Sequence, residues 1–143
     1  MKFSVNQKDL QQSLAYCQGV IEKRSTLPIL SNILIEAHDS KLKITATDLD
    51  LIFVNEIQNV EVIEEGKTTT TSSTLYDIIR KFSSGKKINF NLTSENKIQI
   101  ESEKSVFNLN CMSATEFPLT DENFDENEFT INAKQFLKLL NKC

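Results

Sequence analysis

The sequence predicts an α+β fold in which helices cover one face of antiparallel sheets, and three observations support this prediction. The first is a unit that occurs about three times: a short alternating strand, a polar capping residue and an amphipathic helix. The second is a meander of about three strand-like segments after each of the first two helices. The third is composition, since 39% apolar and 25% charged residues with only three Gly and two Pro are typical of a globular chain.

The repeated unit is clearest at the two ends of the chain. These copies are segment 3–6 with the apolar anchors Leu10 and Leu14, and segment 129–132 with the anchors Phe136 and Leu140. A weaker copy lies between them, where Thr70-Thr71 precede Leu75 and Ile79. A repeat unit generally cannot bury its apolar face alone. We therefore expect one complete domain of two units at 1–125, and the truncated start of a second domain at 126–143.

The first half begins with a helix and continues with strands. Leu10, Leu14, Cys17 and Ile21 recur at helical spacing and predict one apolar stripe. Alternating apolar residues at 33–37 and 42–46 then predict a hairpin, whose polar turn is His38-Asp39-Ser40. Strand-like segments at 51–54 and 60–62 complete this half before Gly66.

The second half repeats this order. Its helix carries the apolar stripe Leu75, Ile78, Ile79 and Phe82. Alternating segments at 88–92, 98–100 and 107–111 predict three strands, with polar turns at 94–96 and 102–104. Because each half supplies one helix and one meander, both helices are expected on the same face of the sheets.

Charge is unevenly divided between the predicted helices and the remaining chain. The helices with their exits (7–24, 72–87 and 133–143) carry ten basic and three acidic residues, which gives +7. The whole chain is −4, so the remainder is −11. One interpretation is that lysines simply solvate the helices. The other is that a basic helical face holds a polyanion without reading its sequence.

Several enzyme-like patterns are weak. Asp48-Leu49-Asp50 resembles a metal-binding pair, but a lone pair of this kind is a poor indicator of a metal site. The three cysteines lack CxxC spacing, the single histidine lies in a predicted turn, and there is no Gly-rich phosphate loop. We therefore expect no catalytic residues, no metal and no cofactor. The N-terminal segment has no long apolar stretch, which favours a cytoplasmic protein without a membrane anchor.

Four segments carry a specific resemblance to a known family. They are 26–32 (TLPILSN, followed by Ile33-Leu34-Ile35), 47–51 (TDLDL), 66–81 (beginning GKT and ending LYDIIRK) and 116–118 (EFP). Together they resemble the bacterial β sliding clamp, the processivity subunit of DNA polymerase III. The resemblance begins at Met1 and runs in order to the last residue.

The resemblance implies a ring of two head-to-tail protomers, each with three similar domains, whose helices line the hole and whose sheets lie outside. Such a ring encircles duplex DNA, slides without base-edge readout and tethers the polymerase, so the implied role is that of a non-catalytic subunit of a DNA-directed DNA polymerase. The implied partners are double-stranded DNA, a second protomer, and the polymerase catalytic subunit and clamp loader, which bind domains absent from this chain.

The resemblance also assigns site residues. Arg24 matches a family DNA contact, and Arg80, with Lys81 beside it, matches the basic lining of the ring. Ser73 occupies a position where some relatives carry a DNA-binding arginine. The surface that meets the partner protomer maps to Thr74 and Ile78 on the second helix and to Phe107 and Leu109 on an edge strand. Core packing is the alternative role for the last two residues.

A second hypothesis comes from a different functional class. The chain could act as a stand-alone protein-interaction domain that assembles through an exposed strand edge. Two further domains of the same kind beyond residue 143 would favour the clamp, and a stop codon there would favour the stand-alone domain.

Overall fold

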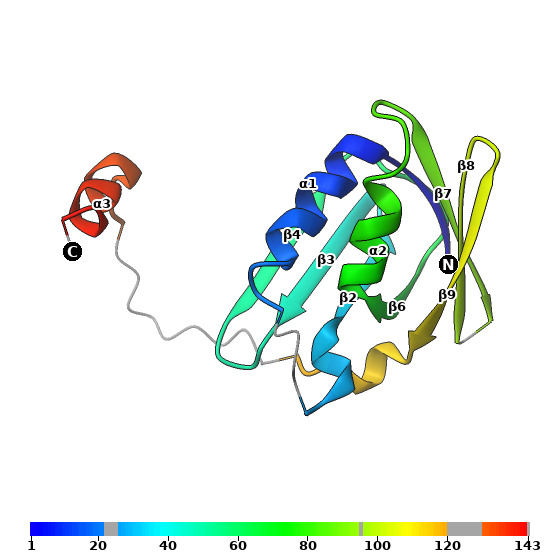
Figure 1. Ribbon diagram of the computed structural model, residues 1–143, viewed down its shortest axis with the longest axis horizontal. Coiled ribbons are helices and arrows are strands. Elements are labelled where there is room, and N and C mark those ends of the chain that lie inside the picture. Colours follow the sequence, from blue (N-terminus) through cyan, green and yellow to red (C-terminus); the bar gives the residue numbers. More distant parts are fainter. Residues whose placement is uncertain (22–25, 95, 120–129, 143) are drawn as a thin grey trace.

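The computed structural model describes residues 1–21, 26–94, 96–119 and 130–142. Figure 1 shows two helices, α1 (Gln7–Cys17) and α2 (Ser72–Ile79), lying side by side over one face of a curved antiparallel sheet. A third helix, α3 (Ala133–Leu140), lies apart from them. The predicted α+β fold, with helices on one face of antiparallel sheets, is confirmed.

The described strands form one continuous order, β4-β3-β2-β6-β9-β8-β7-β1-β5, in which all neighbours are antiparallel. Their bounds are β1 (Lys2–Asn6), β2 (Asn32–His38), β3 (Lys41–Thr47), β4 (Ile52–Ile57), β5 (Glu61–Glu64), β6 (Gly66–Thr71), β7 (Lys87–Ser94), β8 (Lys97–Ser102) and β9 (Ser105–Met112). The predicted hairpin is β2–β3, and its turn residues Asp39 and Ser40 both have positive φ, at 45° and 59°. The second meander is β7–β8–β9.

Two halves of the sheet meet where β6 pairs with β9. Only Thr69↔Met112 and Thr70↔Cys111 are in register there. The Thr69 hydroxyl donates to the Met112 carbonyl and the Thr70 hydroxyl to the Asn110 carbonyl, each at 3.0 Å. The Thr70 hydroxyl thus has a hydrogen-bond partner at the position where the first copy of the unit has the apolar Val5. The short β6–β9 pairing also leaves the first part of β9 paired with β8 alone.

The helices α1 and α2 are held together by buried polar groups at both ends. The Gln7 side chain donates to the Ile79 carbonyl at 3.0 Å, and the Gln18 side chain donates to the Ser72 hydroxyl at 2.8 Å. The start of α1 therefore lies beside the end of α2, so the two helices are antiparallel. The buried Gln7 amide and the partly buried Gln18 amide each have a partner in this way, which avoids the cost of an unpaired polar group.

The main core lies between these helices and the sheet. Leu10, Leu14 and Cys17 of α1 are at most 1% exposed, and Leu75 and Ile79 of α2 are fully buried. The 3₁₀ helix η1 (Pro28–Ser31) packs on β2, and the 3₁₀ helix η2 (Ala114–Glu116) packs on β6. Leu30 of η1 and Phe117, which follows η2, are buried outside the main core.

Some predicted boundaries were wrong. Ile21 and Phe82 belong to the predicted helical stripes but lie beyond the ends of α1 and α2, where they still pack partly buried against the core. The strand predicted at 129–132 is absent at 130–132, and Phe129 lies outside the described residues. A strand needs a neighbour to pair with, and none is available to this segment within the described part of the chain.

Candidate DNA-facing and assembly surfaces

Arg80 caps the C-terminal end of α2 and is exposed. Its Nε lies 3.4 Å from Asp77 Oδ1, and its guanidinium carbon lies 6.0 Å from the centre of the Tyr76 ring. Both members of the ion pair are more than half exposed, so the pair contributes little to stability, of order 0–1 kcal/mol. An approaching phosphate could therefore recruit the guanidinium at small cost.

The other predicted DNA contacts differ in how far the structure places them. Lys81 is exposed, and its ammonium has no ion pair with any residue in the described ranges. Ser73 is exposed in the first turn of α2. Arg24 lies outside the described residues. The structure thus brings Arg80, Lys81 and Ser73 together on one helix and its exit.

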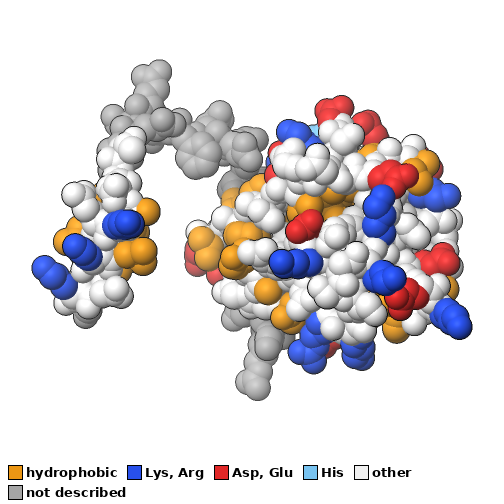
Figure 2. Space-filling view, turned by 90° about the horizontal axis from the view of Figure 1, so that it is seen from above, with side chains coloured by type: hydrophobic (Ala, Val, Ile, Leu, Met, Phe, Trp, Pro, Cys, Tyr) orange, Lys and Arg blue, Asp and Glu red, His pale blue; other side chains and the backbone are white. Residues whose placement is uncertain are grey.

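In the body of the domain, the net charge of the described helical surface is much smaller than the +7 counted over the predicted helices and their exits. Residues 7–21 and 72–82 contain three basic residues (Lys8, Arg80 and Lys81) and two acidic ones (Asp9 and Asp77), which leaves +1. The strands carry lysines of their own, and Figure 2 shows basic and acidic side chains intermingled over the visible face of the body. Only α3 shows basic without acidic groups there.

Two of the lysines assigned to the exit of the second helix form ion pairs with acidic residues of the strands and their turns. Lys87 is the first residue of β7, and its ammonium lies 2.9 Å from a carboxylate oxygen of Glu61 on β5. Lys86 Nζ lies 3.8 Å from Glu103 Oε1 in the β8–β9 turn. Neither pairing follows from local sequence, because each partner is distant along the chain.

The predicted protomer contact maps to a surface where α2 meets β9. Phe107 of β9 packs edge-on against Phe82 beyond α2, with ring centres 5.8 Å apart. Phe107 and Leu109 are both partly buried against the core, so domain packing accounts for part of each side chain. Thr74 is exposed, whereas Ile78 is only 7% exposed and chiefly serves the domain interior.

β9 was expected to be an edge strand, and this is true of only part of it. In the strand order it lies between β6 and β8. Its residues 105–109 nevertheless pair with β8 alone, because β6 reaches only Cys111 and Met112. One side of this stretch is free of strand partners within the described part of the chain.

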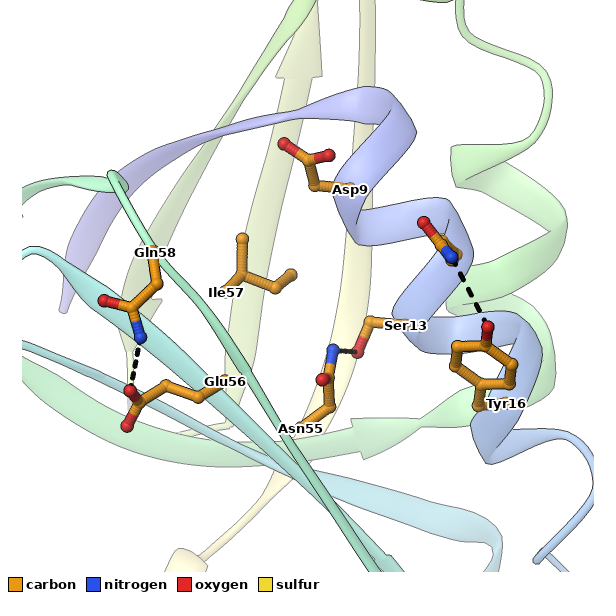
Figure 3. A pocket seen from close by; sticks show the side chains of 8 residues that line it. Asp9, Ser13, Tyr16, Asn55, Glu56, Ile57 and Gln58 are labelled. Carbon is orange, nitrogen blue, oxygen red and sulfur yellow. Dashed lines mark hydrogen bonds between the residues drawn. The ribbon is translucent and has the colours of Figure 1, made fainter. Parts of the chain in front are cut away.

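A polar groove of about 310 Å³ separates α1 from β4 (Figure 3). The Asn55 side chain donates to the Ser13 hydroxyl at 3.0 Å across it, and Asp9 and Glu56 lie on opposite walls. Lys41 and Gln58 hydrogen-bond to the Glu56 carboxylate and lower its pKa. The polar groups of the groove are amides, carboxylates and the hydroxyls of Ser13 and Tyr16, and each of these hydroxyls accepts a hydrogen bond from a side-chain amide.

The Asp48–Asp50 segment is a hydrogen-bonded turn. One Asp48 carboxylate oxygen accepts from the backbone N–H of Asp50 at 3.0 Å and of Leu51 at 2.7 Å. This is the usual local use of an aspartate before a turn. Among the described residues, no group of three or more His, Cys, Asp or Glu side chains could hold a metal ion. None of the described helices is long and apolar enough to cross a membrane.

Sequence reasoning missed an exposed apolar strip at the free edge of β4. Its members are Leu49, Leu51, Ile52 and Val54, between 42% and 53% exposed. The apolar run was visible in the sequence, but its position at the end of the strand order was not. A run of apolar residues alone does not show whether a strand is central or at an edge.

Comparison with known proteins identifies the family of this chain. The family described as "DNA polymerase III beta subunit, N-terminal domain" matches residues 1–121. The β sliding clamp of Caulobacter vibrioides is 31% identical over 144 residues, and that of Escherichia coli is 34% identical over 140 residues. These alignments cover 99% and 98% of this chain but only 38% of each relative.

Solved structures agree with the sequence matches. The polymerase III β subunit of Caulobacter crescentus superimposes with a TM-score of 0.92 at 30% identity, over 99% of this chain and 38% of the other. A clamp from Bartonella birtlesii bound to griselimycin gives 0.93 at 31% identity, over 99% and 37%. This chain therefore belongs to the family of the bacterial DNA polymerase III β subunit, a non-catalytic subunit, and corresponds to its N-terminal domain.

Proposed function

We propose that this chain is the first domain of a processivity clamp that encircles duplex DNA and tethers the replicative polymerase. The observation that carries the proposal is the agreement of fold and sequence with β sliding clamps along nearly the entire chain. Because the chain spans 38% of the length of these relatives, the ring would require further domains. We assign 1–125 to the first domain and 126–143 to the start of the second.

DNA would be held by enclosure and weak attraction. The modest positive charge of the described helical surface suits this role, because every neutralised phosphate makes binding more salt-dependent and would oppose sliding. We assign contacts with the phosphate backbone to Arg80 and Lys81, with Ser73 and Arg24 completing the set. None of these side chains is expected to read base edges.

Ring closure would use the α2–β9 surface. Exposed Thr74 and partly buried Phe107 and Leu109 provide a small polar and apolar patch. It lies beside the stretch of β9 that pairs with β8 on one side and has no strand partner on the other within the described residues. Ile78 would support this patch from within the domain. The expected partner is the last domain of a second protomer, in a head-to-tail homodimer.

The remaining partners, the polymerase catalytic subunit and the clamp loader, would bind the domains that follow. The resulting protein would act in the cytoplasm as a non-catalytic part of the nucleotidyl-transferring polymerase assembly. Its contribution to synthesis would be to keep the catalytic subunit on DNA.

The test uses the protein encoded by the complete gene, loaded by its clamp loader onto nicked circular plasmid DNA. We expect retention on circles during gel filtration and loss after linearisation. Lys81→Glu should reduce loading at moderate salt, whereas Lys97→Glu, an exposed lysine at the start of β8, should not. Equal retention on circles and linear DNA would exclude topological binding.

The 1–143 chain itself should bind DNA weakly, at about 10⁻⁴ M or weaker at physiological salt, because a few basic residues release few counterions. It should neither enclose DNA nor support processive synthesis. Fluorescence anisotropy with linear and circular duplexes would measure this. Tight binding, or a preference for circles, would contradict the assignment of enclosure to the complete protein.

A further inference from the structure

The sheet face opposite the helices carries a polar hollow over β1, β7 and β8. Along these strands Phe3, Ile88 and Phe90 belong to the core, so the residues that alternate with them lie on the other face. The hollow on that face has a volume of about 260 Å³. Its lining includes Lys2, Asn89, Asn91, Gln99 and Glu101, with the exposed Ile63 of β5 at one side. This face takes no part in the DNA contacts or the ring closure proposed above.

Strand pairing arranges the five polar side chains in two rows. Lys2 lies opposite Asn91, and Asn91 lies opposite Gln99, which makes one row across the three strands. Asn89 lies opposite Glu101 in the second row. The rows are about 6.7 Å apart along the strands, and neighbouring strands are about 4.8 Å apart. Lys2 and Glu101 therefore lie at opposite corners, with the three amides between them.

The amides of the hollow have hydrogen-bonding groups that the domain does not use. No described residue hydrogen-bonds to the side chain of Asn89, Asn91 or Gln99. By contrast, the amides of Gln7 and Asn32 bond to residues far away in the sequence. Each side-chain amide offers two N–H donors and a carbonyl acceptor. Three such groups, two of them partly buried, thus line one hollow and face outward.

Opposite charges mark the two corners of the hollow. Lys2 and Glu101 are exposed, and neither forms an ion pair with a described residue. The N-terminal ammonium, 2.8 Å from Glu64 Oε1, is the main cause of the lowered pKa of Glu64, and Lys2 adds a smaller contribution. A ligand with a carboxylate near Lys2 and a cation near Glu101 would therefore meet complementary charge at both ends.

The shape and lining of the hollow favour a peptide over a small molecule. Small-molecule pockets usually measure about 300–1,000 Å³ and are lined mainly by apolar side chains, whereas this hollow is smaller and mainly polar. An extended peptide repeats every two residues at about 6.7 Å, which is also the spacing between Asn89 and Asn91 on β7. Each peptide unit has one donor and one acceptor, which a side-chain amide can match with its own.

We propose that this hollow binds an extended peptide segment of a partner protein, with an acidic side chain beside Lys2 and a basic side chain beside Glu101. The amides of Asn89, Asn91 and Gln99 bond to the peptide backbone between these two charges. A partner held here leaves the DNA-facing and ring-closing surfaces free. The first domain would then recruit proteins in its own right, in addition to its proposed place in the ring.

The test is a titration of the isotope-labelled 1–143 chain with the peptide acetyl-Gly-Glu-Asn-Lys-Gly-amide, followed by nuclear magnetic resonance. The side-chain amide signals of Asn89, Asn91 and Gln99 should shift together. We expect a dissociation constant on the order of 10⁻³ M, because exposed ion pairs and single hydrogen bonds each contribute little. A peptide with Gln in place of both Glu and Lys should bind about tenfold more weakly.

Three variants separate the charges from the amides. Lys2→Gln and Glu101→Gln should each weaken binding of the charged peptide about threefold and leave the neutral peptide unaffected. Asn91→Ala removes an amide and should weaken binding of both peptides. Lys104→Gln in the β8–β9 turn and Glu116→Gln in η2 are exposed, charge-matched controls and should bind like the wild type. Thermal melting verifies the fold of every variant.

Several results would overturn the proposal. They include unshifted amide signals at about ten times the expected dissociation constant, and equal binding of the charged and neutral peptides. Equal shifts with a mixture of free glutamate and free lysine would assign the hollow to single amino acids instead. Shifts that depend on protein concentration without any peptide would assign this face to a second copy of the chain. None of these measurements needs DNA or a ring, so their failure leaves the clamp assignment untouched.

Discussion

The first and third helices have the same local sequence pattern but different surroundings. The side chain of Asn6 accepts from the Lys8 backbone N–H at 2.9 Å, and that of Asn132 accepts from the Lys134 backbone N–H at 3.0 Å. The matching apolar anchors differ completely in burial. Leu14 of α1 is 0% exposed and Leu140 of α3 is 54% exposed.

The two helices show that capping and the apolar pattern depend on neighbouring residues, whereas burial depends on distant ones. An N-cap and an apolar stripe are properties of a few neighbouring residues, and both copies of the unit have them. Burial of the stripe requires a sheet, which α1 obtains from β1 before it and from β3 and β4 after it. Every described residue of α3 is exposed, so this helix has its cap but lacks a core to pack against.

The largest expected effect comes from truncating the matched leucines. Leu14→Ala should lower the free energy of unfolding by about 2–5 kcal/mol, because it leaves a cavity in a packed core. Leu140→Ala should change it by less than about 0.5 kcal/mol. Urea denaturation followed by circular dichroism measures both. Equal losses would show that α3 is also packed into a core, and the contrast between the two helices would be wrong.

The buried thiol at the end of α1 predicts a dependence on high pH. Burial raises the pKa of Cys17 from 9.0 to about 12. Because the folded protein holds the Cys17 thiol protonated, the free energy of unfolding is highest below pH 9. It falls as pH rises from 9 towards about 12, where the unfolded chain ionises its thiol and the folded protein does not. Three pKa units correspond to about 4 kcal/mol at most.

Urea titrations between pH 8 and 12 measure this loss, with Cys17→Ala as the control for other titrating groups. The difference between wild type and variant should narrow with rising pH as the wild type loses stability. A constant difference across this range would contradict a thiol that stays protonated in the folded state.

Phe107 at the α2–β9 surface is expected to serve both the domain interior and the contact with a second protomer. In the ring proposed for the full-length protein, Phe107→Ala should weaken dimer closure by about 2 kcal/mol or more, as for other aromatic anchors. The isolated domain should also lose stability, because Phe107 packs against Phe82. Sedimentation of the full-length variant measures the dimer dissociation constant. Urea denaturation of the 1–143 variant measures the loss of domain stability. An unchanged dimer constant with intact folding would remove Phe107 from the interface.

The smallest expected effect concerns the two caps. Asn6→Ala should lower the free energy of unfolding by about 1 kcal/mol. Asn132→Ala should leave this free energy unchanged and reduce only the helical signal of α3. The matched pair can be measured by urea denaturation and far-ultraviolet circular dichroism. If Asn132→Ala destabilised the domain as much as Asn6→Ala, α3 would have to be coupled to the main core.

The sequence predicted the elements of the fold because periodicity is a local property. The β2–β3 hairpin, both meanders and the buried faces of α1 and α2 follow directly from apolar spacing. Features that depend on distant partners did not follow. Lys87 is held by Glu61, and the apolar strip at the free edge of β4 is exposed because no strand lies beyond β4 in the described order.

The candidate site shows the same limit. Arg80, Lys81, Ser73 and Thr74 could be placed on one exposed helix and its exit from local pattern and resemblance. Core packing of Phe107 was one of the two roles considered from the sequence, but its ring partner could not be predicted, because Phe82 is 25 positions away in the sequence. Long-range ion pairs also engage two residues of the expected basic face, because Lys86 pairs with Glu103 and Lys87 pairs with Glu61.

Hydrogen exchange of the 1–143 chain tests most directly whether 1–125 folds as a clamp domain while the helix within 130–142 lacks a sheet to pack against. The backbone amides of Leu14 and Cys17 in α1 should exchange only through global unfolding, and those of Leu137 and Leu140 in α3 should exchange at nearly the unprotected rate. Comparable protection of the two helices at low protein concentration would contradict this account.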